Sequence, residues 1–144
     1  VVLCRIARLL GRVVGDGDEL ARWGGEEFVV ATMLAPGEDV LAFAERLRMA
    51  VVAEAIEVTA AHRVTASVGV AVWPTAAATL DRHDWTVSLG LADIALYRAK
   101  ASGRNRCALI TYPGIGPEDW PERPDTAIVR RWLDEGRAEL HLRP

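Results

Sequence analysis

The stretch "RWGGEEFVV", residues 22–30, decides how the chain folds, because it predicts a β-hairpin with an unusual tip. Two predicted strands, Leu20 to Trp23 and Phe28 to Met33, flank a turn that contains Gly24 and Gly25. A two-residue hairpin turn with positive φ at both central positions strongly favours glycine, and both glycines can supply it at little steric cost. The sequence therefore predicts that the two glycines are the centre of the turn.

Glu26 and Glu27 follow the glycines, and strand alternation sends them to opposite faces. Without Cβ atoms, the glycine backbone can approach a bulky anion such as a triphosphate. One carboxylate can reach a divalent cation while the other holds a neighbouring group or a second ion, and Mg²⁺ prefers oxygen ligands together with substrate phosphates and water. Taken alone, the stretch is also explained by an ordinary exposed acidic turn, and such turns are common.

Helices and strands alternate around this hairpin, which predicts an α/β fold with a mixed central sheet flanked by helices. Helical spacing of apolar residues predicts a first helix that reaches Val13 and a long second helix over residues 38–55. The run "VTASVGVAV", residues 64–72, is apolar nearly throughout and predicts a central strand covered on both faces. An irregular loop is expected from Thr75 to Trp85, before a helix that ends near Gly103.

A second polar motif, "ADIALYRAKASGRN", spans residues 92–105. Tyr97, Lys100 and Arg104 lie at spacings of three and four near the end of the predicted helix. The two cations can clamp phosphates, as an ammonium and a bidentate guanidinium. The alternative is that they simply complement the dipole at the helix C-terminus.

In this order and at these separations, RWGGEEF, VTASVGVAV and ADIALYRAKASGRN resemble the GGDEF domain of diguanylate cyclases, in which GGEEF is an accepted variant of the signature. The resemblance covers about residues 1–111. It implies a fold like the palm of nucleotide cyclases and polymerases. It also implies a homodimer that joins two GTP molecules, one held by each subunit, into cyclic di-GMP.

The resemblance also implies roles for the polar residues. Gly24 and Gly25 would cradle the GTP phosphates, and the two basic residues of the second motif would contact the terminal phosphates. Glu26 and Glu27 would be the catalytic and metal-binding pair, acting with Mg²⁺ or Mn²⁺ to activate the attacking 3′-hydroxyl.

Other residues of the family pattern have no counterpart in this chain. The second metal-binding aspartate of the family lies on its first strand, and its guanine-reading Asn and Asp follow that strand, before the first helix. The chain opens at that helix, so we expect an N-terminally truncated piece of a longer protein. We expect these residues alone neither to bind GTP tightly nor to turn it over.

Many family members carry an inhibitory, product-binding RxxD motif just before the signature. The matching residues here are Gly15–Asp18, so the aspartate, Asp18, is present and a glycine replaces the arginine. Arg46 matches a secondary contact of that site, although it is also explained as a solvated helix arginine. Product inhibition through this remnant is therefore expected to be weak or absent.

The composition changes after the second motif. Residues 112–125, "YPGIGPEDWPERPD", hold four prolines and two glycines and predict a linker. Residues 126–144 then resemble the start of an EAL domain, the cyclic di-GMP phosphodiesterase often fused behind GGDEF. Leu142 and Arg143 replace the Tyr and Gln of that start, which puts the partner domain's full activity in doubt.

The formal net charge of −3 gives the chain no electrostatic footprint for nucleic acid. No apolar run approaches the roughly 20 residues of a membrane span, so a cytoplasmic domain is expected, with upstream segments able to anchor the protein to the inner membrane. Two functions stay open: a cyclase fused to an EAL domain, or a catalytically degenerate GGDEF–EAL module that senses GTP or binds a partner protein.

Overall fold

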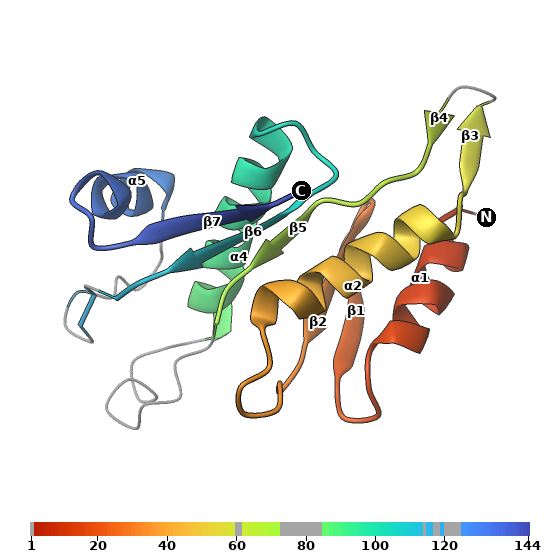
Figure 1. The fold of residues 1–144 in the computed structure, drawn as a ribbon, viewed down its shortest axis with the longest axis horizontal. Helices are drawn as coiled ribbons and strands as arrows, with labels where there is room; N and C mark the ends of the chain where they lie inside the picture. Colours follow the sequence, from red (N-terminus) through yellow and green to blue (C-terminus); the bar gives the residue numbers. More distant parts are fainter. Residues whose placement is uncertain (1, 60–61, 73–84, 114, 117–118, 120–124) are drawn as a thin grey trace. The chain divides into compact units, whose positions relative to one another are not determined.

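The computed structural model describes residues 2–59, 62–72, 85–113, 115–116, 119 and 125–144 (Figure 1). They belong to two compact units, Val1–Ala66 and Ser67–Pro144, and each unit is described by itself. Helices alternate with strands and one of the sheets is mixed, so the predicted α/β class is confirmed. Among the described residues, no helix combines the length and apolar character needed to cross a bilayer.

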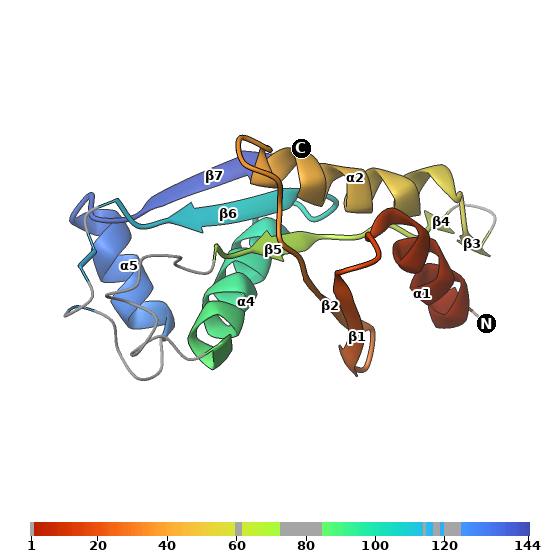
Figure 2. The same cartoon turned by 90° about the horizontal axis from the view of Figure 1, so that it is seen from below.

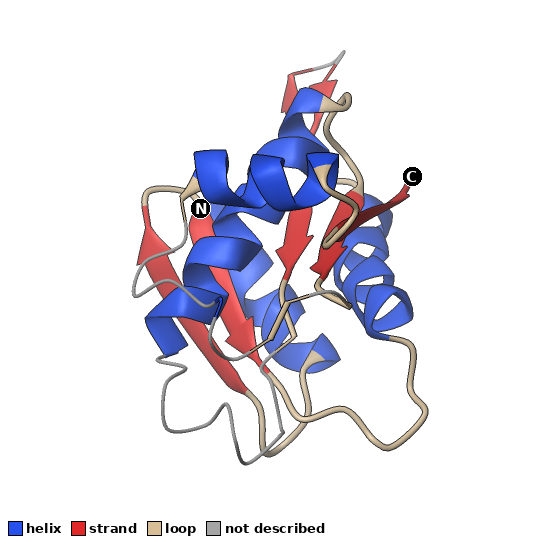
Figure 3. Ribbon diagram, turned by 90° about the vertical axis from the view of Figure 1, so that its left-hand side faces the viewer, coloured by secondary structure: helices blue, strands red, loops and turns tan. Residues whose placement is uncertain are grey.

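The first unit is built from two helices and two hairpins. Its elements are α1 (Val2–Val13), β1 (Glu19–Gly24), β2 (Glu27–Ala31), α2 (Val40–Ala53), β3 (Glu57–Thr59) and β4 (His62–Arg63). Helix α2 begins later than predicted, because the Asp39 carboxylate accepts a hydrogen bond from the Leu41 amide at 2.8 Å and caps the helix. The strands β1 and β2 run antiparallel, side by side (Figure 3).

One apolar core joins these elements. Leu9 and Leu10 of α1 are buried with Phe43, Leu47 and Val51 of α2. The inner face of the hairpin adds Leu20, Phe28 and Val30, which are partly buried against this core. The helices therefore hold the hairpin at its base, while residues 21–27, which include the turn, are exposed.

The second unit is a three-stranded sheet with helices packed on it. Its elements are β5 (Val68–Val70), α4 (Trp85–Ala101), β6 (Cys107–Thr111), α5 (Thr126–Asp134) and β7 (Glu139–Arg143). Strand β6 pairs in parallel with β5 and antiparallel with β7, and Figure 2 shows α4 and α5 on the same face of the sheet. The region predicted to start an EAL domain thus supplies one helix and one strand to this unit.

The core of the second unit lies between the helices and β6. Leu91 and Ala95 of α4 are fully buried, and Ile110 of β6 and Trp132 of α5 are almost so. The ring of Trp132 meets that of Tyr112 edge to face, with centroids 6.1 Å apart. These contacts make α5 part of the core that supports α4.

Strand β5 differs from the sequence prediction. It was expected to be central and covered on both faces, but it covers only three residues, is half-buried, and has β6 as its neighbour at one end of the described sheet. The apolar residues of β5 pack against α4. A Cβ at Gly69 would lie 2.1 Å from the Ala92 carbonyl oxygen and 2.3 Å from the Leu96 nitrogen, so the helix backbone rests directly on this glycine. The loop predicted from Thr75 lies almost wholly outside the described residues.

Candidate nucleotide-binding site

The turn of the β1–β2 hairpin is shifted by one residue from the prediction. Arg22 pairs with Phe28, but Gly24 pairs with Glu27, so one extra residue on β1 forms a bulge. Gly24 is therefore the last strand residue, and Gly25 and Glu26 are the centre of the turn. Only Gly25 has a positive φ, 51°, as in hairpin turns with glycine at the first central position. The prediction that both glycines are at the centre of the turn was wrong, because the sequence of one strand does not reveal a bulge in its pairing with the other.

The backbone conformation at position 24 does not require glycine. Its φ is not positive, and among the described atoms a Cβ at Gly24 would meet nothing within 4 Å. A Cβ at Gly25 would also enter open space, although the φ of that residue favours glycine. Among the described residues, neither packing nor a positive φ therefore requires glycine at position 24.

The carboxylates of Glu26 and Glu27 stand at the exposed tip of this turn. Carboxylate oxygens suit Mg²⁺ or Mn²⁺, which keep water and substrate phosphates among their ligands. The described residues contain no group of three or more His, Cys, Asp and Glu side chains placed to hold a metal by themselves. The pair fits a metal that is shared with a bound phosphate, and it does not form a closed protein cage.

Arg22 was not predicted as a site residue, yet it contacts the turn. Its Nε and Nη2 donate hydrogen bonds to the Gly25 carbonyl oxygen at 3.0 and 2.6 Å. The only signal in the sequence is an arginine three positions ahead of the turn glycine, which is uninformative until the bulge is known.

Lys100 and Arg104 lie at the end of α4 in the second unit. Lys100 is in the last helical turn and half-buried, which suits the helix-dipole alternative, whereas Arg104 lies beyond the helix and is exposed. Gly103, Arg104 and Asn105 have φ values of 116°, 61° and 46°, three consecutive left-handed residues. For an arginine this region is uncommon and strained, and such strain gathers at functional sites.

Hydrogen bonds hold the strained segment. The Arg104 amide donates to the Ala99 carbonyl at 3.1 Å, and the Asn105 amide donates to the Ser67 hydroxyl at 3.1 Å. Arg106 Nε donates to the carbonyl of Arg104 at 3.1 Å. The segment is thus fixed through both amides and a carbonyl, and the Arg104 side chain projects from a defined backbone.

Asp18 and Arg46, the expected inhibitory-site remnant, line one hollow of about 400 Å³ in the first unit. Hydrogen bonds from the Thr32 hydroxyl and then from the Gly15 amide hold the pKa of the Asp18 carboxyl below its usual value. Arg46 donates to Glu38 at 2.8 Å and lies over the Phe43 ring, 5.1 Å from its centroid. Both residues are therefore already engaged within the chain.

The structure brings the predicted residues together in three groups: the glycines and glutamates on one turn, Asp18 and Arg46 in one hollow, and Lys100 and Arg104 at one helix end. The first two groups belong to the first unit and the third to the second. The sequence model of the diguanylate cyclase GGDEF domain matches residues 1–106, which include all three groups.

The chain belongs to the GGDEF family.

Characterised relatives agree with this assignment. The chain is 38% identical over 109 residues to diguanylate cyclase DgcM of Escherichia coli K12, covering 73% of the chain and 24% of that protein. Diguanylate cyclase A of Treponema denticola is 33% identical over 110 residues, which cover 76% of the chain and 28% of that protein. MucR of Pseudomonas aeruginosa, a bifunctional diguanylate cyclase/cyclic di-GMP phosphodiesterase, is 31% identical over 106 residues, with 73% and 15% covered.

The GGDEF chain thus spans about a quarter or less of the length of two of these relatives and 28% of the third. No solved structure matches it.

Proposed function

We propose that the whole protein is a diguanylate cyclase that condenses two GTP molecules into cyclic di-GMP and works as a homodimer. In each of two steps, a ribose 3′-oxygen forms a bond to the α-phosphorus of the other GTP, the bond to pyrophosphate breaks, and the hydroxyl proton is lost. The observation that supports the proposal is the GGEEF turn itself, where a Cβ at Gly24 would meet none of the described atoms within 4 Å and two carboxylates follow the glycines at the exposed tip.

Each group has a chemical task in this reaction. The bare backbone of Gly24 and Gly25 would admit phosphates. In the family pattern, Lys100 and Arg104 would offer cationic donors to terminal phosphate oxygens. Glu26 and Glu27 would hold Mg²⁺ or Mn²⁺, which offsets phosphate charge and makes the attacking hydroxyl more acidic. Positioning of the two nucleotides contributes much of the remaining rate enhancement.

Formation of cyclic di-GMP from GTP and Mg²⁺, followed by chromatography, tests the proposal on the whole protein. Glu27→Gln should lower the rate about a hundredfold or more, because a neutral amide is a poor metal ligand. The matched control is Glu19→Gln, an exposed glutamate at the start of β1, which should leave the rate unchanged. Equal rates for wild type and Glu27→Gln would contradict the proposal.

We also propose that residues 1–144 alone do not turn GTP over, since the family's second metal aspartate and its guanine-reading residues have no counterpart in them. The same assay on the 144-residue chain decides this, and clear product would contradict it.

An EAL phosphodiesterase fused behind this chain is proposed from the EAL-like residues 126–144, and the bifunctional relative MucR supports it. The whole protein should then also hydrolyse cyclic di-GMP, which a phosphodiesterase assay measures. A protein that binds GTP without either activity would instead favour the degenerate, GTP-sensing or partner-binding module.

A further inference from the structure

Arg22 links the wall of the hairpin to its turn. Its side chain makes two hydrogen bonds to one acceptor, the carbonyl oxygen of Gly25, across only three positions of sequence. That carbonyl belongs to the central peptide of the turn, between the residue with positive φ and Glu26. The guanidinium therefore fixes the orientation of this peptide plane.

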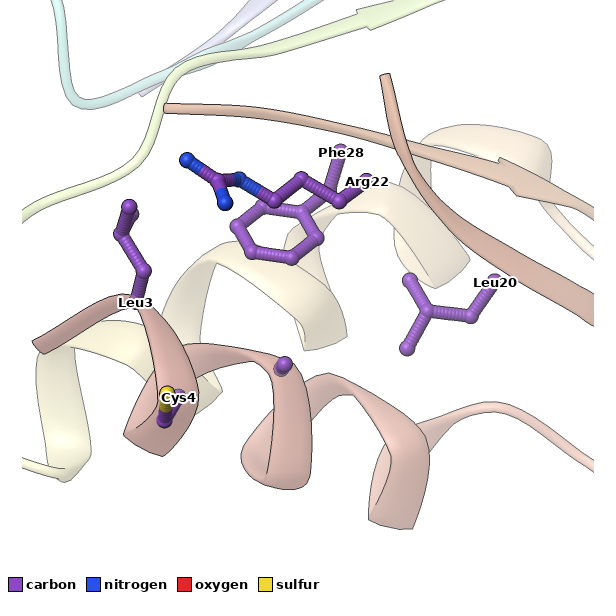
Figure 4. A pocket seen from close by; sticks show the side chains of 6 residues that line it. Leu3, Cys4, Leu20, Arg22 and Phe28 are labelled. Atoms are coloured by element: carbon purple, nitrogen blue, oxygen red, sulfur yellow. The ribbon is translucent and has the colours of Figure 1, made fainter. Parts of the chain in front are cut away.

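The bulge makes this reach possible. Arg22 and Phe28 are register partners, so their side chains share a face of the hairpin, and both line a hollow of about 220 Å³ beside α1 (Figure 4). The apolar stem of an arginine can follow such a wall while its charged head reaches a polar group. Because the extra residue, Trp23, bends the strand, the head arrives at the turn carbonyl.

We propose that Arg22 is a positioning residue that holds the Gly25–Glu26 turn in its nucleotide-binding shape, an inference that rests on the proposed function. Arg22 acts through the turn, because its donors face the Gly25 carbonyl oxygen. Hydrogen bonds from a charged donor are stronger than neutral ones, so the two bonds from the guanidinium hold the Gly25 carbonyl oxygen firmly. Loss of Arg22 frees the peptide plane to rotate and moves the Glu26 carboxylate with it.

The first test needs no nucleotide and uses the 144-residue chain labelled with ¹⁵N. In wild type, the Arg22 Nε–H signal should exchange slowly with water. In Arg22→Ala, the amide signals of Gly25 and Glu26 should shift and broaden, while those of α2 stay in place. Arg22→Lys, which keeps one cationic donor of similar reach, should move them less. The control is Arg8→Ala, an exposed arginine on α1, which should leave both amides unchanged.

The second test is steady-state kinetics of the whole protein. Arg22→Ala should raise the KM for GTP about tenfold and lower kcat about tenfold, since a small misplacement of a binding group can cost up to a hundredfold. Arg22→Lys should recover most of both losses. A merely structural role would reduce the amount of folded enzyme and leave the KM unchanged.

The outcomes separate the two proposals. Unchanged Gly25 and Glu26 signals in Arg22→Ala would overturn the role of Arg22, whatever the enzyme does. So would an unchanged KM with a reduced yield of folded protein. Wild-type protein that makes no cyclic di-GMP would overturn the proposed function, and the amide signals would still decide whether Arg22 holds the turn.

Discussion

The main-chain amide of Asn105 donates a hydrogen bond to the hydroxyl of Ser67, 3.1 Å away and 38 positions apart in sequence. Ser67 directly precedes β5, and Asn105 ends the left-handed segment that carries Arg104. The VTASVGVAV and GRN motifs, which the sequence shows only as separate signatures, are therefore physically joined.

Ser67→Ala should remove this bond and cost about 1 kcal/mol of unfolding free energy, the typical value for one hydrogen bond. The Asn105 amide should also exchange faster with solvent. Urea denaturation and amide exchange measure the two effects. The exposed hydroxyl of Ser102 offers a control, and Ser102→Ala should change neither quantity by more than a few tenths of that amount.

Arg104→Gly should separate stability from function. Glycine adopts a φ of 61° without strain, so the free energy of unfolding should stay the same or rise by up to about 1 kcal/mol. Loss of the guanidinium should weaken GTP binding by the whole protein. Arg106→Gly, at a residue whose φ is not positive and whose side chain donates to the Arg104 carbonyl, should lower stability instead. A clear loss of stability in Arg104→Gly would refute the strain argument.

Gly69→Ala should destabilise the second unit by about 1–3 kcal/mol or more, because its Cβ would collide with the backbone of α4. Gly17→Ala is the matched control, because among the described atoms a Cβ there meets nothing within 4 Å and its φ is not positive. Thermal unfolding of both variants checks the prediction, and equal midpoints would contradict it.

Much of the first unit could be predicted, and the reasons lie in periodicity. The apolar spacing of Val2–Val13 predicts α1, and the glycines between two apolar runs predict the hairpin. The bulge at Trp23 could not be predicted, because it depends on register, and register is set by contacts with the opposite strand. The contact of Arg22 with Gly25 follows from that bulge and was missed with it.

In the second unit, the features that the sequence does not predict depend on tertiary contacts. An apolar run such as VTASVGVAV indicates burial, but it does not tell whether a strand or a helix covers it, and α4 resting on Gly69 supplies much of that cover. The left-handed Arg104 is also invisible in the sequence, since tertiary hydrogen bonds hold it there. The glycines, glutamates and basic residues of the candidate site were predicted from the family resemblance, and their roles stay predictions.

The stability of the fold should depend on pH through Asp18. Its carboxyl has a folded pKa below the unfolded value of 3.8, so ionised Asp18 stabilises the fold above that value. This stabilisation is lost as the pH falls through the lower, folded pKa. The difference in urea midpoint between wild type and Asp18→Ala should thus be constant above about pH 5 and shrink at more acidic pH.

Trp132→Ala should destabilise the second unit by about 3–5 kcal/mol, because the ring is almost fully buried in the core beneath α4. Trp85→Ala, at a residue 54% exposed, should cost much less. Loss of near-ultraviolet circular dichroism and a lowered denaturation midpoint would show the effect. A Trp132→Ala chain as stable as wild type would contradict the role of this ring in the core of the second unit.

The short sequence separation between Arg22 and Phe28 also affects the order in which the parts of the chain fold. A β-hairpin forms within about 1–10 μs, because only a short length of chain has to be ordered. The contact between Arg22 and Gly25, three positions apart in sequence, can form in the same step. The bond between Ser67 and Asn105 must wait for a loop of 38 positions to close, which costs more entropy and depends on packed helix and strand. During folding or synthesis, the acidic turn should therefore reach its final shape well before the segment that carries Arg104.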